Sequence, residues 1–252
     1  MGILKNRTGE TKTTRYGQVM TIIKYNNCHD IDVKFDDGTI VENVECSNFV
    51  KDTIKNPCRP SVCGVGYMGI GEYSFITNKR IYIAWRGMLE RCYVARSLNR
   101  SRGASYKECS VDSRFYNFQY FCNWFINNIW NEKCIILDKD ILIKNNKIYS
   151  PESCILVDQR INCLFTKRSN YRGNCCIGVK YYNNHYVAQC NDVNGVRRCL
   201  GWFDTEMEAF NCYKEYKEEV IKQVADIYKK KYENFPQKLY NAMYCYEIDY
   251  ND

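Results

Sequence analysis

Three short extended segments near the end of the chain carry basic side chains that could recognise a nucleic acid. Their basic residues are Lys180, Arg197 and Arg198, and Asp192 is the only acidic residue between positions 177 and 203. Arginine and lysine pair with the hydrogen-bond acceptors of guanine and with backbone phosphates. The composition of these segments therefore indicates a basic surface that contacts DNA.

A small sheet and one long helix must position these side chains. The sequence predicts strands over 177–182, 185–190 and 197–203, followed by a helix from about Thr205 to Tyr232. Thr205 and Glu208 have the spacing of a capping box, in which each side chain bonds a free amide at the helix start. Because one helix covers only one face of a sheet, we expect the other face to be exposed.

Alternation along the strands assigns their side chains to two faces. It predicts that the face under the helix holds Val179, Tyr181, Val187 and Leu200. The opposite face is expected to hold Lys180, Tyr182, Tyr186, Ala188 and Arg198. From this basic sheet we expect contacts to double-stranded DNA from Lys180, Tyr182, Tyr186, Arg197, Arg198 and Trp202.

The same segment resembles the Apetala-two (ethylene-response-factor) DNA-binding domain. The residues that carry the resemblance are Gly178-Val179, the turn Asn194-Gly195, the run from Leu200 to Thr205, Glu208-Ala209 and Tyr213. The resemblance covers about forty residues and implies a three-stranded sheet and a helix that bind duplex DNA. The alternative is a module of the same shape that binds a protein or no ligand.

The middle of the chain is similar to HNH-type homing endonucleases of phages and mobile elements. The residues that carry this similarity include Trp85, Met88, Trp124, LDKD at 137–140, YSPESC at 149–154 and Asn162. The resemblance implies a magnesium or manganese ion held by Asp138 and Asn162, with Asp140 as a further carboxylate, that assists phosphodiester hydrolysis. Lys139 stands in the place of the general-base histidine of that family. We also expect Arg160 and Arg168 to contact DNA.

A non-catalytic interpretation of these central residues stays open. In it, Asp138 and Asp140 are solvated strand residues and Asn162 caps a helix end, so that the chain binds DNA without cutting it and acts as a regulator or decoy. Neither His29 nor His185 lies near the LDKD segment. Whether the protein is an enzyme therefore stays undecided, with hydrolysis the favoured reading.

Charge and cysteine content indicate the kind of partner and the cellular compartment that we expect for the protein. The net charge is +7, and residues 1–176 carry +9 while residues 177–252 carry −2, which favours a polyanion as partner. The 16 cysteines include no C-x-x-C pair, so we expect reduced thiols and no zinc site. With no apolar run long enough for a membrane span and no leader pattern, we expect an intracellular protein of a bacterial host. A host protein remains a further candidate partner.

The pattern of elements predicts an α+β chain of three modules. Alternating Ile31, Val33 and Phe35 and the Asp-Gly turn after them favour a small β-barrel over residues 1–56. The HNH-like module is expected over residues 57–168. It would contain helices around Trp85 and Phe121, two strands over 134–143 and 147–157, and a short helix over 158–165. The Apetala-two-like module is expected over residues 169–252.

Overall fold

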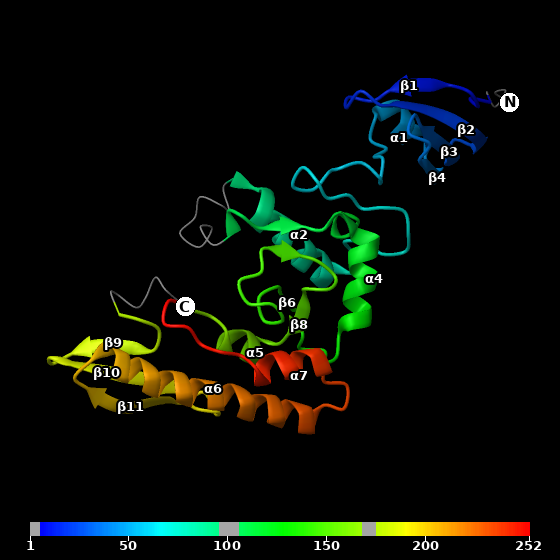
Figure 1. Cartoon of the computed structure of the whole chain (residues 1–252). Coiled ribbons are helices and arrows are strands. Elements are labelled where there is room, and N and C mark those ends of the chain that lie inside the picture. The colour runs from blue at the N-terminus through cyan, green and yellow to red at the C-terminus, as the bar shows by residue number, and fades with distance from the viewer. Residues whose placement is uncertain (1–5, 96–105, 168–174) are drawn as a thin grey trace.

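The chain is a mixed α+β protein with several separate sheets, as the sequence predicts at this coarse level (Figure 1). The computed structural model describes residues 6–95, 106–167 and 175–252. None of the helices in these ranges combines the length and the apolar character that a membrane crossing requires.

The N-terminal unit is an open antiparallel sheet with one short helix. Its strands are β1 (Thr11–Thr13), β2 (Val19–Asn27), β3 (Asp30–Phe35) and β4 (Ile40–Val44), which pair in chain order, and its helix is α1 (Cys46–Lys51). The expected closed barrel is wrong, because β1 and β4 lie at opposite edges of the sheet. Phe49 of α1 packs with Ile22 and Val33, so a helix rather than closure buries the apolar face.

Two predicted helices form the aromatic core of the central unit. They are α2 (Lys79–Tyr93) and α4 (Phe118–Asn128), with the short 3-10 helix η2 (Ser113–Tyr116) between them. Trp85 and Phe118 pack with ring centroids 5.2 Å apart. The Trp85 indole donates a hydrogen bond of 2.6 Å to the carbonyl of Phe115, which satisfies its buried N–H.

The strands of the central unit are shorter than expected. β6 (Ile136–Asp138) pairs antiparallel with β8 (Ile155–Val157), while β7 (Ile148–Tyr149) pairs parallel with β5 (Ser110–Val111). The prediction that residues 139–143 continue the first strand is wrong, because the chain turns immediately after Asp138. The predicted short helix is confirmed as α5 (Gln159–Leu164).

The C-terminal sheet has the predicted strands and helix. β9 (Val179–Tyr182), β10 (His185–Asn191) and β11 (Arg197–Phe203) form an antiparallel sheet with β10 in the centre. Helix α6 (Glu206–Lys231) begins at the predicted capping box, in which the Thr205 hydroxyl accepts from the Glu208 amide and the Glu208 carboxylate accepts from the Thr205 amide. A further helix, α7 (Gln237–Tyr244), was not expected.

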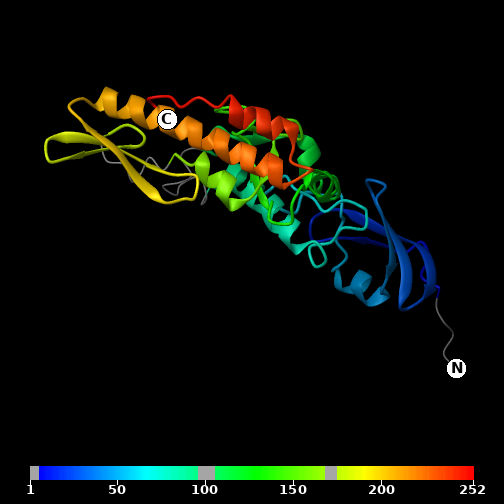
Figure 2. The same cartoon turned by 90° about the horizontal axis from the view of Figure 1, so that it is seen from below.

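Helix α6 belongs to two hydrophobic cores at once. Near its start, Phe210 and Tyr213 pack against the C-terminal sheet. Near its end, Val224 and Tyr228 pack with β8, α5 and α7. Figure 2 shows this helix running from the sheet along the central elements. The sheet and the central unit are therefore connected by one continuous element.

Two glycines of the C-terminal sheet give a matched test of its packing. Gly178 and Gly195 have φ angles of +79° and +81°, a conformation that costs other residues about 1 to 2 kcal/mol. A Cβ at Gly178 would lie 2.1 Å from the Tyr213 ring, whereas a Cβ at Gly195 meets nothing within 4 Å. We expect Gly178→Ala to lose about 1 to 3 kcal/mol more unfolding free energy than Gly195→Ala in urea denaturation. Equal losses would contradict this packing of the sheet on α6.

Candidate nucleic-acid interface

Helix α6 covers one face of the C-terminal sheet. Val179, Ala188 and Cys190 point toward it and pack with Phe210 and Tyr213. Cys190 is buried, and burial raises the pKa of its thiol. This face is a closed hydrophobic core, so the sheet has only its other face for a ligand.

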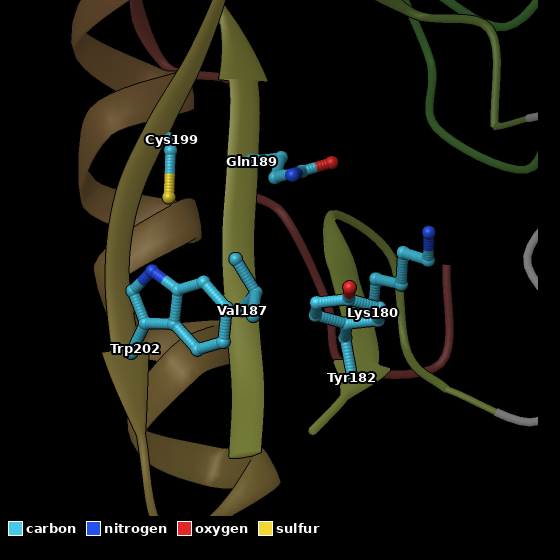
Figure 3. A pocket seen from close by; sticks show the side chains of 6 residues that line it. All are labelled: Lys180, Tyr182, Val187, Gln189, Cys199 and Trp202. Carbon is cyan, nitrogen blue, oxygen red and sulfur yellow. The ribbon is translucent and has the colours of Figure 1, made fainter. Parts of the chain in front are cut away.

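The other face, which we call the free face, contains an open hollow of about 450 Å³. Figure 3 shows the six side chains that line it, from all three strands. They are Lys180, Tyr182, Val187, Gln189, Cys199 and Trp202. The free face therefore combines one cation, two aromatic rings, an amide and a thiol around an apolar centre.

Strand register brings these side chains together. Val187 on the central strand lies opposite both Lys180 and Trp202, so the three form one row across the sheet. A register shift follows between Ala188 and Gln189, after which Gln189 lies opposite Cys199. Gln189 and Cys199 were not singled out from the sequence. Gln189 continues the two-residue alternation of Val187, whereas Cys199 is three residues from Trp202 and shares its face only because of this register shift.

Arg197 extends the free face beyond the hollow. Its guanidinium donates a hydrogen bond of 2.5 Å to the Oε1 atom of Gln189, which holds the fork in a defined orientation. At the opposite side, the Lys180 ammonium lies 5.6 Å from the centroid of the Tyr182 ring. Four predicted DNA contacts thus share one face of the sheet, namely Lys180, Tyr182, Arg197 and Trp202.

Tyr186 and Arg198 do not lie on this face, and their expected placement there is wrong. Tyr186 packs with the core under α6, and its ring centroid is 5.0 Å from that of Tyr181. Arg198 lies opposite the buried Cys190 and forms a 2.8 Å ion pair with Asp192. The prediction failed because it used the polarity of the side chains. Apolar Val187 lies on the free face, and charged Arg198 lies at the edge of the covered face.

The two other predicted DNA contacts are Arg160 and Arg168. Arg160 on α5 donates a 2.6 Å hydrogen bond to the carbonyl of Val193, in the turn between β10 and β11. Its guanidinium also lies 5.6 Å from the Tyr228 ring centroid. Arg160 thus links α5 to the sheet. Arg168 lies outside the described residues.

The side chain of Asp138 shapes the turn after β6. One carboxylate oxygen accepts hydrogen bonds from the amides of Asp140, at 2.7 Å, and Ile141, at 2.8 Å. Burial of this carboxyl raises its pKa, because a charge is costly where water is displaced. Asp138 therefore acts here as a cap that ends the strand.

Lys139 and Asp140 are engaged with each other. The Lys139 side chain is buried, and its ammonium lies 2.7 Å from the Asp140 carboxylate and 2.6 Å from the carbonyl of Asn146. The Asn146 side chain returns a 3.0 Å hydrogen bond to the carbonyl of Lys139. These contacts close residues 138–146 into a self-contained loop, which we call the central loop.

The carboxylates of the central loop already have partners within the loop. A buried ammonium already neutralises the Asp140 carboxylate, and Asp138 directs one oxygen to two backbone amides. Asn162 lies in α5, where its backbone amide bonds the carbonyl of Asp158 at 3.0 Å. Within the described ranges, no group of three or more His, Cys, Asp or Glu side chains is placed to hold a metal ion.

Comparison with known proteins leaves these sites to be interpreted from their own chemistry. No family model, curated protein or solved structure matches the chain.

Asp138 gives a prediction about stability. Asp138→Ala removes the acceptor for two backbone amides and should cost about 1 to 2 kcal/mol of unfolding free energy. Asp138→Asn keeps an acceptor oxygen without the buried charge. Since the raised pKa means that the folded protein binds the proton more tightly, wild-type stability falls as the pH rises from about 4 through that pKa.

The advantage of Asp138→Asn over the wild type should therefore grow with pH across that window and be smallest in acid. Urea denaturation at several pH values measures it. A stability difference between Asp138→Asn and the wild type that is independent of pH would contradict a raised pKa of the Asp138 carboxyl.

Proposed function

We propose that this protein binds double-stranded DNA through the free face of β9, β10 and β11. The observation that carries the proposal is the arrangement of Lys180, Arg197 and two exposed aromatic rings on the one sheet face that α6 leaves uncovered. A two- or three-stranded sheet is narrow enough to enter the major groove, where base edges are read.

Each polar group on this face has a defined task in the proposal. Gln189 holds the guanidinium of Arg197, which would direct its remaining donors to the O6 and N7 acceptors of a guanine. Lys180 lies at the other edge and would bind a phosphate, which fixes the register of the sheet on the duplex. The resemblance to the Apetala-two domain supports the same assignment.

Charge outside the sheet supports a polyanionic partner. The sheet and the helices after it have a net charge of −2, and the first 176 residues have +9. Affinity for the DNA backbone would then come largely from the upstream part of the chain, while the free face would supply the choice of site.

We propose binding rather than hydrolysis as the role of the protein. Asp138 and Asp140, the two carboxylates that the resemblance places at a metal, are used in this chain to build a turn and an ion pair with Lys139. No cleavage step is therefore assigned to Asp138, Lys139, Asp140 or Asn162. The role that follows is that of a DNA-binding regulator or decoy.

Two neighbouring arginines give the sharpest test. Arg197 lies on the free face and Arg198 on the covered one, where it pairs with Asp192. We expect Arg197→Ala to weaken binding to a selected duplex by about 1 to 3 kcal/mol, and Arg198→Ala to leave it nearly unchanged. Lys180→Ala should lower the slope of log affinity against log salt by about 1.

Fluorescence anisotropy with a labelled duplex selected from a random pool measures these quantities. Equal effects of the two arginine changes on DNA affinity would contradict binding of DNA by the free face. The same wild-type preparation should leave supercoiled plasmid intact with magnesium or manganese, as with EDTA. Metal-dependent nicking that Asp138→Asn abolishes would contradict a purely binding role.

A further inference from the structure

The hollow on the free face has an apolar floor between two aromatic walls. Tyr182 and Trp202 are each 53% exposed, and their ring centroids are 6.0 Å apart. Val187 lies between them on the central strand and is only 3% exposed, because the rings and the stem of Lys180 surround it (Figure 3). An apolar side chain at this position leaves the centre of a polar face without a hydrogen-bonding group.

The geometry of the Tyr182 and Trp202 rings determines whether a base can stack between them. A base stacked between two rings needs parallel planes about 7 Å apart, which is twice the ordinary contact distance between carbon atoms. The planes of Tyr182 and Trp202 meet at 58°. The two rings therefore contact each other, and an apolar group of a ligand would rest on their exposed surfaces rather than between them.

The major groove offers one apolar group at the base edges, the C5-methyl of thymine. We propose that the hollow takes this methyl group on the exposed rings of Tyr182 and Trp202, which thereby select thymine at one position of the DNA site. This inference rests on the proposed binding of duplex DNA through the free face. It adds an apolar reading position beside the guanine that Arg197 would recognise.

The surroundings of the hollow suit a base edge more than a free apolar ligand. Its rim holds the Lys180 ammonium and the Gln189 amide, and the Oε1 atom of Gln189 is already bonded to Arg197. The amide N–H donors of Gln189 are not used in that bond. Donors at the rim and an apolar centre complement acceptor atoms that flank a methyl group.

Replacing thymine by uracil tests the inference, because uracil lacks only this methyl group. A duplex selected from a random pool with the full chain is resynthesised with uracil at each thymine in turn, and each version competes with the parent duplex. We expect one position at which uracil weakens wild-type binding by about 4-fold, the effect of one buried methyl group.

Trp202→Ala should bind the parent duplex more weakly and lose the distinction between thymine and uracil at that position. Met207→Ala is the matched control, since Met207 is equally exposed, at 53%, but lies on α6. It should keep the 4-fold distinction. Together these two results support the hollow as the methyl site.

Two outcomes overturn the inference, and they differ from failure of the proposed function. Specific binding without any uracil-sensitive position, or a sensitive position that Trp202→Ala leaves unchanged, refutes the methyl site and retains DNA binding by the free face. Absence of duplex binding by the wild-type chain refutes the proposed function and the inference with it.

Discussion

The packing of helix α6 determines which surfaces of the C-terminal half are buried and which are exposed. The helix has 26 residues, about 39 Å of length, and its buried stripe serves the sheet with Phe210 and the central unit with Val224. Because α6 closes one face of the sheet, the basic and aromatic residues remain together on the other. Because it continues into the central core, the free face is held in a fixed relation to α5 and α7.

Polar contacts reinforce this connection from the other end of the chain. Ile248 reaches back into the core between α6 and the sheet, and its amide and carbonyl bond Glu218 and Lys214. Asp252 forms ion pairs with Lys144 at 2.9 Å and with Lys167 at 2.7 Å. Lys144 belongs to the central loop, so the terminal segment ties that loop to the sheet-bearing unit. These contacts fix the position of the central loop.

Sequence patterns predicted the helices and strands better than they predicted which side chains share a face of the C-terminal sheet. Residues such as Trp85 and Phe121 recur at helical spacing and predict α2 and α4, and the Thr205–Glu208 pair predicts the start of α6. The free face was predicted only in part, because Val187 is apolar yet faces outward. The turn at Asp138 could not be predicted, since it depends on side-chain bonds to the backbone that no periodicity reports. The closed barrel failed for a related reason: strand patterns do not show that α1 covers the sheet.

Protection of Cys199 by DNA tests directly whether the free face binds the duplex. Cys199 is exposed within the hollow of the free face, and Cys245 is exposed just after α7. The rate at which a maleimide alkylates each thiol can be followed by peptide mass spectrometry, with and without a saturating selected duplex. We expect the duplex to slow alkylation of Cys199 several-fold and to leave Cys245 unchanged. An unchanged rate at Cys199 in a fully formed complex would contradict binding through the free face.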